Sequence, residues 1–443
     1  MVSKEFLDII PNRAGADMGS EAVFIHVAGQ KVTSFPTHTR GLKECLAYLQ
    51  KHNIDSVAVE ATGVYWMNFF DICHESGLDV WLINPKYTKT RAGKKTDVQD
   101  AVWIQRLHSA DFLEKSFVPE MAIRELREYV KTRENYVREG ARKVNQMNKA
   151  LIMMNIRLDN VISEIHGVSG MKMIEAILSG QRDANRLIEL CHIKIRKHKK
   201  EALRDALNGN YQPQYLFNLR MALDDYNYLK EKIKSCDLYI QKQLKNLASK
   251  LPKPALLKKA KPMRHNNPKI KDMQLYMQTL CGGIDVTTIP GLTNYSVLRL
   301  ISILGNKMDQ WPTKKHFTSY LNLSPKQNQS GKSKKRQKKT PIHPAGQIFR
   351  EIAQPLLNSK HIHLGVVGRK IRARKGPQIA IKALARKIAE LFYICLSKQE
   401  EYIERSVQYH EETKRLAIIK RLTRQASKLG FKLIDTNTAQ VIN

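Results

Sequence analysis

The chain has 443 residues, of which 42% are hydrophobic, and 75 Lys and Arg against 41 Asp and Glu give it a formal charge of +34. This apolar content supports packed cores and excludes a wholly disordered chain. No run of 18 apolar residues occurs, so we expect no membrane-spanning helix. The six cysteines form no CxxC pair and the first residues lack a signal-peptide pattern, which predicts a cytoplasmic protein without a disulfide or zinc framework.

Charge is distributed unevenly along the chain. Residues 1–112 contain 12 Lys and Arg and 13 Asp and Glu, a net charge of −1, so the remaining residues carry +35. A body this basic favours a polyanionic partner, and nucleic acid is the class that fits best. A surface that is merely basic and soluble is the alternative interpretation.

Residues 13–112 alternate between strand and helix patterns, which predicts an α/β domain over residues 1–115. The segments 14–18, 23–27 and 31–35 are separated by short turns at Gly19-Ser20 and Gly29-Gln30, which indicates three antiparallel strands. The periodicity of the apolar residues then predicts the later elements in this order: helix 40–52, strand 54–60, helix 64–75, strand 79–84 and helix 97–108.

Four acids occupy the ends of these predicted elements. Asp17 ends the first strand, Glu60 ends the fourth, and Asp97 and Asp100 open the last helix on one face. Carboxylates brought together are costly unless a cation neutralises them, and hard oxygen ligands select Mg²⁺ or Mn²⁺. Singly, each acid is explained as a surface charge or a favourable charge at a helix N-terminus. Together they predict metal-dependent phosphodiester chemistry.

Residues 116–250 carry two heptad stripes, which predict a helical coiled-coil arm. Arg133 and Gly140 interrupt the first stripe. The two helices are expected either to pack antiparallel or to pair with another subunit, and residues 163–213 are a possible insertion at the tip. The stripes consist of Val130, Val137, Val144, Leu151 and Leu158 with Met147, Met154 and Val161, and of Leu219, Tyr226, Ile233, Ile240 and Leu247.

A basic linker is expected at 251–283, because Lys250–Lys271 carries eight Lys and Arg, no acid and four prolines. In the following domain, 284–398, Val286–Gly305 predicts a helix, a tight Pro290-Gly291 turn and a second helix. The glycine permits a left-handed backbone, and the next amides could bind a phosphate. An ordinary helix–turn–helix packing unit is the alternative. The tail at 399–443 is predicted to be helical and has no assigned role.

Residues 324–389 contain 17 Lys and Arg and one acid, Glu351. Ser330 precedes a glycine within this basic stretch. A serine hydroxyl attacks phosphate only when a base or a metal activates it, and the alternative role of Ser330 is a turn in a phosphate-binding loop. We interpret His361 and His363 as surface or nucleic-acid-contacting residues. The predicted nucleic-acid contacts in this stretch are Lys326, Lys332, Lys334, Lys335, Arg336, Lys338, Lys339, Arg372, Arg374 and Lys375.

Two regions resemble the DEDD insertion-sequence transposases of the insertion sequence 110 family. DMGSEAVFIHV, VAVEATGVYW and NPKYTKTRAGKKTDVQDAVWIQRL match in acids, spacing and flanking residues. YLNLSPKQNQSGK resembles the family's Leu-Gly-Leu-x-Pro stretch followed by serine-serine-glycine, with Gln329 in the first serine place and Ser330 in the second. Where the family has Lys-x-Gly-Asn, this chain has Pro344-Ala345-Gly346-Gln347.

The resemblance implies a RuvC-like ribonuclease H fold for residues 1–115 and a mainly helical transposase domain with a helix-hairpin-helix element. It also implies that Asp17, Glu60, Asp97 and Asp100 bind Mg²⁺ and that Ser330 is the nucleophile. Residues 374–396 resemble the family's closing helix, which implies that Lys382, Arg386 and Lys387 contact the nucleic-acid backbone. The implied partners are target and donor double-stranded DNA, a noncoding bridge RNA that guides recombination, and further copies of the chain in dimers that join into a tetramer.

Two alternatives stay open at the level of the sequence. One is a RuvC-like structure-specific endonuclease in which water is the nucleophile and Ser330 only binds phosphate. The other is a non-enzymatic RNA-binding scaffold with vestigial acids.

Overall fold

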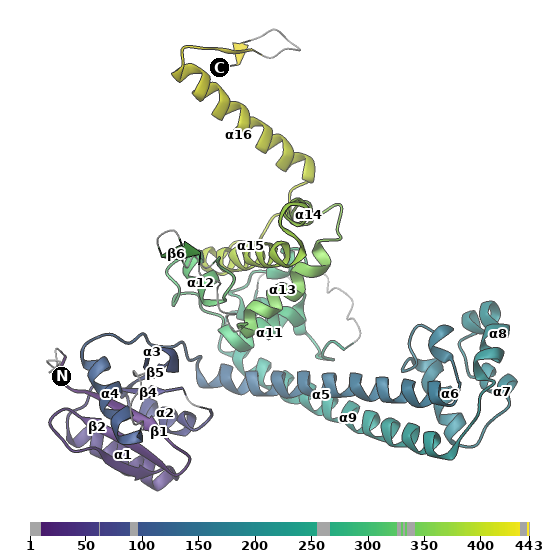
Figure 1. The fold of residues 1–443 in the computed structure, drawn as a ribbon, viewed down its shortest axis with the longest axis horizontal. Coiled ribbons are helices and arrows are strands. Elements are labelled where there is room, and N and C mark those ends of the chain that lie inside the picture. The colour runs from purple at the N-terminus through teal and green to yellow at the C-terminus, as the bar shows by residue number, and fades with distance from the viewer. Residues whose placement is uncertain are drawn as a thin grey trace. The chain divides into compact units, whose positions relative to one another are not determined.

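Residues 13–83 form a five-stranded sheet, whose strands at 22–27, 56–60 and 79–83 contain the valines and isoleucines that favour β-structure. The computed structural model describes residues 10–61, 63–88, 96–254, 266–325, 329–330, 333–334, 342–434 and 441–442. The chain divides into two compact units, Met1–Val118 and Pro119–Asn443. The elements of the first unit (Figure 1) are β1 (Arg13–Met18), β2 (Ala22–Val27), β3 (Thr33–Pro36), α1 (Thr39–Lys51), β4 (Ser56–Glu60), α2 (Trp66–Glu75), β5 (Asp79–Ile83), α3 (Pro85–Thr88) and α4 (Asp97–Ser109).

The sheet has the strand order β3-β2-β1-β4-β5. The first three strands pair antiparallel, as the sequence predicts, whereas β1 pairs with β4 and β4 with β5 in parallel. This mixed sheet with its helices is compatible with a RuvC-like fold. The predicted order of strands and helices is confirmed, and the short helix α3 is an addition to it.

The two faces of the sheet bury different residues. Ala14, Ala16 and Val59 point to the face that packs against Leu42 of α1 and Phe69 of α2. The alternate residues of the same strands point to the opposite face, which α4 covers by packing against β1, β2 and β4. The period of two along β1 and β4 therefore separates a wholly apolar core from the face on which the acids lie.

The second unit is mainly helical. Its elements are α5 (Met121–Met153), η1 (Leu158–Asn160), α6 (Val168–Leu178), α7 (Ala184–Glu189), α8 (Ile193–Leu207), α9 (Pro213–Ser249), α10 (Met273–Leu280), η2 (Val286–Thr288), α11 (Asn294–Leu304), α12 (Lys314–Tyr320), β6 (Gln329–Ser330), β7 (Ser333–Lys334), α13 (Pro344–Leu356), α14 (His363–Lys375), α15 (Pro377–Lys398), α16 (Val407–Lys428), β8 (Leu433–Ile434) and β9 (Val441–Ile442).

Helices α5 and α9 pack antiparallel along their length (Figure 1), which is one of the two arrangements left open by the sequence. Lys143 in the second half of α5 pairs with Asp225 in the first half of α9 at 2.7 Å. Gln243 near the end of α9 donates to the Ala122 carbonyl near the start of α5 at 3.0 Å. Gly140, which interrupts the stripe, faces Tyr226 across this contact. The pair is thus an intramolecular arm.

The first stripe was expected to continue in one helix through Leu158 and Val161, but α5 ends at Met153. Asn155 adopts a left-handed backbone with φ 56°, and the Ile156 amide donates to the Leu151 carbonyl at 2.9 Å. This is the Schellman pattern that closes a helix C-terminus. Leu158 and Val161 follow this helix end and pack in the separate core at the tip of the arm.

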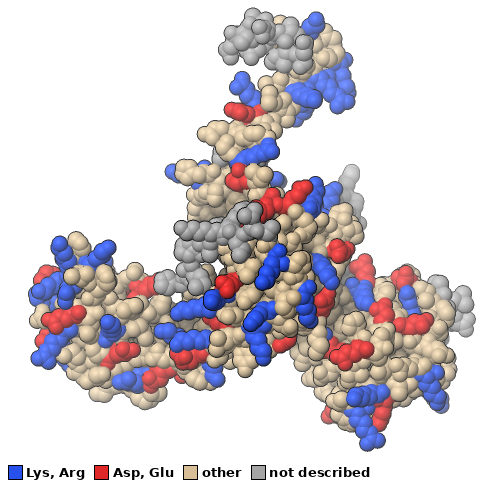
Figure 2. All heavy atoms as spheres, turned by 180° about the vertical axis from the view of Figure 1, so that it is seen from behind, with Lys and Arg blue, Asp and Glu red and all other residues tan. Residues whose placement is uncertain are grey.

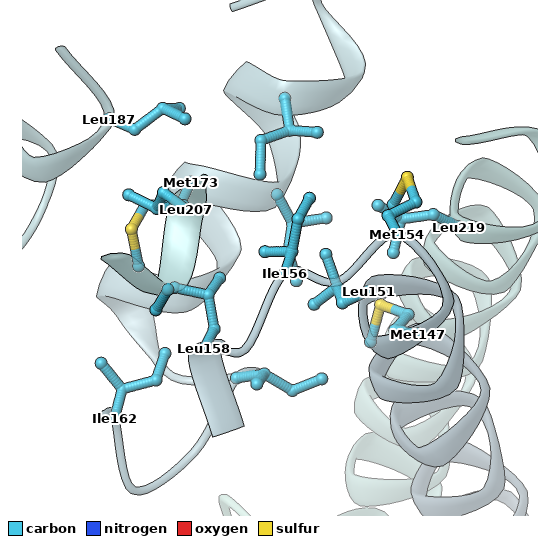
Figure 3. Packing of buried hydrophobic residues seen from close by; sticks show 14 of the residues in the cluster. Met147, Leu151, Met154, Ile156, Leu158, Ile162, Met173, Leu187, Leu207 and Leu219 are labelled. Atoms are coloured by element: carbon cyan, nitrogen blue, oxygen red, sulfur yellow. The ribbon is translucent and has the colours of Figure 1, made fainter. Parts of the chain in front are cut away.

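The tip is a small helical assembly with its own core (Figure 3). Met173, Leu187 and Leu207 pack there with Leu151 from the end of α5 and Leu219 from the start of α9. The chain enters and leaves the tip at adjacent points, because the Asn210 amide donates to the Met154 carbonyl at 2.8 Å. The tip therefore closes on itself at the end of the arm.

A buried ion pair joins the two arm helices near their base. Arg133 is 1% exposed and its Nε lies 2.5 Å from Oδ1 of Asp237, which is 5% exposed. The other carboxylate oxygen accepts the Lys269 amide at 2.9 Å, and the guanidinium lies 5.4 Å from the ring of Tyr295 in α11. The residue that interrupts the apolar stripe thus ties α5 to α9, to the chain before α10 and to α11.

The C-terminal helices pack on this base. The Arg127 guanidinium of α5 donates to the Ser302 carbonyl at 3.0 Å and to the Ile303 carbonyl at 2.8 Å, so it caps the C-terminus of α11. Phe349 of α13 packs edge-on against Phe392 of α15. No helix in the described ranges is long and apolar enough to cross a membrane.

The predicted helix at Val286 is only the 3-10 turn η2. Asp285 caps it by accepting from the Thr287 amide at 2.9 Å, and Ile289 is extended because it precedes proline. Gly291 has φ 86°, as predicted, and a Cβ there would lie 2.8 Å from Ile352 Cγ2. The Thr293 amide donates to the Ser296 hydroxyl in a capping box, so this amide is already hydrogen-bonded inside the protein and is not open to a phosphate.

We expect Arg133→Met to lower the free energy of unfolding by about 3–5 kcal/mol, because it leaves the Asp237 carboxylate buried without its cation. Arg133→Met with Asp237→Leu should recover most of this loss. Lys143→Met breaks a more exposed pair on the same arm and should cost about 1 kcal/mol or less. Denaturant unfolding measures all three, and equal losses for Arg133→Met and Lys143→Met would contradict the role given to the buried pair.

Candidate active site

Asp17 and Glu60 lie at the ends of two neighbouring parallel strands. The register pairs Gly15 with Ala58 and Ala16 with Val59, so Asp17 and Glu60 follow as the next residues on β1 and β4. Paired strands are about 4.8 Å apart, and residues in register point to the same face. Because Ala58 packs against Ile104 of α4, both acids belong to the face that α4 covers.

Helix α4 lies unusually close to β1. A Cβ on Gly15 would lie 2.3 Å from the Gln105 nitrogen and 2.5 Å from the Ala101 oxygen, both of them backbone atoms. At the opposite end of the strand, the Arg13 side chain donates to the His108 carbonyl at 2.7 Å. The helix therefore runs antiparallel to β1, and its first turn is directed toward the end of the strand that carries Asp17.

Asp97 and Asp100 lie in this first turn. Thr96 begins the helix, since its hydroxyl accepts from the Gln99 amide at 3.3 Å. Asp97 precedes the buried Ala101 by four residues, and Asp100 precedes the buried Ile104 by four, so both extend the sheet-facing side of α4. Asp97 is exposed and Asp100 half-buried. The fold thus directs all four predicted acids to one edge of the sheet.

The Glu60 side chain is held from the side of β5. The Thr88 hydroxyl, in the short helix after that strand, donates to Glu60 Oε2 at 2.6 Å. Thr88 is 7% exposed, and its hydroxyl also lies 3.2 Å from the Pro85 carbonyl. One carboxylate oxygen of Glu60 is therefore oriented by a neutral donor, which is the kind of support that positions a metal ligand.

The residues at this edge fit a hard divalent cation by their chemistry. All four donors are carboxylates, which suit Mg²⁺ or Mn²⁺. Among the described residues no group of three or more His, Cys, Asp or Glu side chains converges closely enough to hold a metal ion. The fold brings the four acids to one region and the coordinating geometry stays a prediction.

The predicted nucleophile lies in a basic loop of the second unit. Ser330 is in the short strand β6, opposite Ser333 of β7 in an antiparallel pair. The structure describes the backbone of these strands and not their side chains. The role of Ser330 therefore stays a prediction.

The chain that leads into this loop is fixed. Leu321 and Leu323 are buried, and between them Asn322 adopts φ 54°. Asn is tolerated in this left-handed region, which explains how it can stand in the glycine place of the Leu-Gly-Leu motif. From α15, the Lys382 ammonium donates to the Ser324 carbonyl at 3.0 Å. Lys382, predicted to contact nucleic acid, thus also anchors the start of the loop.

The other predicted nucleic-acid contacts divide into three groups. Arg372, Arg374 and Lys375 are exposed in the last turn of α14. On α15, Lys387 is exposed, whereas Arg386 pairs with Glu390 at 2.9 Å. For Lys334 only the backbone is described, and outside the described residues lie Lys326, Lys332, Lys335, Arg336, Lys338 and Lys339.

His361 and His363, interpreted from the sequence as surface or nucleic-acid-contacting residues, lie just before and at the start of α14. His361 is exposed, and the His363 amide donates to Glu404 at 3.3 Å at the start of α14. The sequence analysis missed Thr88 and Gly15. A hydroxyl residue close after a strand-end proline and a glycine two residues before a strand-end acid are the signals that point to them.

Two models of known protein families match this chain, one in each of the two regions that carry the sequence motifs. A DEDD-type IS110 model, described as a transposase, matches residues 14–155, which span the sheet with its four acids and the whole of α5. A second model, described as the transposase IS116/IS110/IS902 family, matches residues 285–350, from η2 into α13. No curated protein matches the chain. The two matches occur in the order expected from the motifs, and the chain carries two regions that match the IS110 family of DEDD transposases.

Proposed function

We propose that this transposase cuts and rejoins DNA through a phosphoserine intermediate, with Ser330 as the nucleophile. The observation that carries the proposal is the seating of α4 on Gly15, which directs Asp97 and Asp100 toward the strand ends that bear Asp17 and Glu60. Such a set of acids is suited to phosphoryl chemistry. The transposase matches over both regions supply the substrate class, which is DNA.

Each exchange conserves the number of phosphodiester bonds. The Ser330 hydroxyl loses its proton and its oxygen attacks the phosphorus, so that a P–Oγ bond forms while the bond to the leaving DNA oxygen breaks. That oxygen takes up a proton. In the second step a hydroxyl of the other DNA strand loses its proton and its oxygen attacks the phosphorus, so that a new P–O bond forms while the P–Oγ bond breaks and Oγ takes up a proton. Because the bonds exchanged are of one kind, rejoining requires no ATP.

Asp17, Glu60, Asp97 and Asp100 would hold Mg²⁺, or Mn²⁺ in its place. When bound, the ion would lower the pKa of the attacking hydroxyl and offset charge on the non-bridging phosphate oxygens. The Thr88 hydroxyl would keep Glu60 oriented for this role. The basic side chains of the Ser330 loop and of α14 and α15 would hold the DNA backbone.

The guide and the assembly form a second part of the proposal. A noncoding bridge RNA would pair with target and donor DNA, so that the protein contributes chemistry and backbone contacts while the RNA selects the sites. Dimers that join into a tetramer would bring the acids of the first unit and Ser330 of the second into composite sites, with the α5–α9 arm as assembly machinery. The excess of 35 positive charges beyond residue 112 supports binding of both nucleic acids.

Ser330→Ala is expected to abolish recombination and to remove a covalent protein–DNA adduct, because no other oxygen then occupies the attacking position. Ser333→Ala, on the paired strand, is the matched control and should keep both. Adduct formation is measured by denaturing gel electrophoresis with labelled DNA. Cleavage by Ser330→Ala at the wild-type rate without an adduct would favour the endonuclease that uses water.

Asp100→Asn is expected to abolish recombination and leave RNA and DNA binding within about twofold, because it removes one ligand charge and keeps the volume. Asp111→Asn, at the other end of α4, is the control and should recombine normally. Gel-shift and recombination assays on the same preparations test both. Wild-type recombination by Asp100→Asn would remove this residue from the metal site.

Thr88→Val is expected to weaken Mn²⁺ binding by about tenfold, as loss of a residue supporting a metal ligand commonly does, whereas Thr88→Ser should bind normally. Electron paramagnetic resonance of free Mn²⁺ gives the affinity without turnover, and circular dichroism checks folding. Equal affinity of the valine and serine variants would show that the Glu60 contact is only structural.

A further inference from the structure

The tail contains an abrupt change of charge that neither family match covers, since the second match ends at residue 350. Residues 399–412 hold five acids and one Lys or Arg, whereas residues 413–434 hold seven Lys and Arg and no acid. Helix α16 spans the change, beginning after Ser406, whose side chain accepts from the Tyr409 amide at 3.1 Å. The positive charge is therefore concentrated on the distal half of one helix.

The distal half of α16 has two distinct faces. Lys420, Arg424 and Lys428 follow one another at intervals of four residues and are all exposed, with Arg421 beside them. Among the described residues none of these four cations forms an ion pair. Figure 2 shows blue side chains gathered over the end of α16 that adjoins the grey residues. The basic face is thus available for an external anion.

Away from the row of Lys420, Arg424 and Lys428 lie Leu422, which is 41% exposed, and Ile418, which is 40% exposed and three residues before Arg421. An apolar face opposite a basic one is also the pattern of a helix that lies on an anionic membrane. Arg415, however, lies on the same face, three residues before Ile418 and seven before Leu422, and is exposed. No Trp or Phe occurs in the helix. Both features disfavour insertion among lipids, so charge complementarity points to a nucleic acid.

We propose that the basic face of α16, formed by Lys420, Arg421, Arg424 and Lys428, binds the phosphate backbone of a nucleic acid. The face spans about 12 Å of helix, and a duplex presents one phosphate charge per about 1.7 Å of its axis, so every cation on it can reach a phosphate. Such contacts recognise backbone and not sequence. The tail thereby adds a nucleic-acid contact that is separate from both matched transposase regions.

The test compares three full-length proteins: the wild type, a variant with Lys420, Arg421, Arg424 and Lys428 changed to Gln, and a control with Lys31, Arg40, Lys43 and Lys51 changed to Gln. The control loses the same charge from exposed positions of the nearly neutral first unit. Fluorescence anisotropy at several salt concentrations gives the affinity for a random-sequence DNA duplex and for a structured RNA. Binding to anionic phosphatidylserine vesicles is measured as a third comparison.

The α16 variant should bind nucleic acid about tenfold or more weakly than the wild type. For duplex DNA, the slope of the logarithm of the binding constant against the logarithm of the salt concentration should fall in magnitude by about 3 to 4, whereas the control should stay near the wild type in both quantities. Weaker binding of the α16 variant to the DNA duplex assigns the face to DNA, and weaker binding to the structured RNA assigns it to RNA. Unchanged binding of both nucleic acids overturns the proposal, as does a loss confined to the vesicles. Because binding is measured without turnover, this result does not depend on the role of Ser330.

Discussion

The close contact between α4 and β1 is the constraint on which the candidate site depends. Only a residue without a Cβ lets the helix backbone approach Gly15 as it does, since an added carbon would overlap the Gln105 nitrogen and the Ala101 oxygen. The direction of α4 then determines where its first turn lies. A side chain at Gly15 would displace the helix and move Asp97 and Asp100 away from the edge of the sheet, although all four acids would still be present in the sequence.

In the second unit, polar contacts add to the apolar packing where the arm meets the C-terminal helices. Arg133 and Asp237 connect the arm helices, and Arg127 of α5 caps α11, so charged side chains link α5 to α9 and to α11. Buried charges are costly unless they are paired, and they therefore define one arrangement better than interchangeable apolar residues would. Arg133, the cation that interrupts the apolar stripe, thus fixes how α5 packs against α9 and α11.

The sequence predicts those parts of the structure that depend on local periodicity. The strand pattern around Asp17 and Glu60 and the helix opened by Asp97 give the correct element order, and the apolar stripes give the arm. Features that depend on tertiary contacts could not be predicted in this way. The heptad spacing continues through Leu158, yet the left-handed backbone at Asn155 ends α5 earlier. The Thr88 hydroxyl reaches Glu60 only because β4 and β5 are neighbours, and the coordinating geometry of the acids and the side chain of Ser330 stay predictions.

The two ends of the tip lie next to each other, and this affects how many residues can be inserted at the end of the arm. The Asn210 amide meets the Met154 carbonyl, so the two ends of the intervening chain are already in contact where α5 stops and α9 is about to begin. Loop-closure entropy grows only slowly with the number of residues between two such points. The arm therefore accommodates tips of very different size at little entropic cost, provided that each replacement covers Leu151 and Leu219. Variation in length among relatives would be concentrated at this junction, leaving the pairing of the two long helices unchanged.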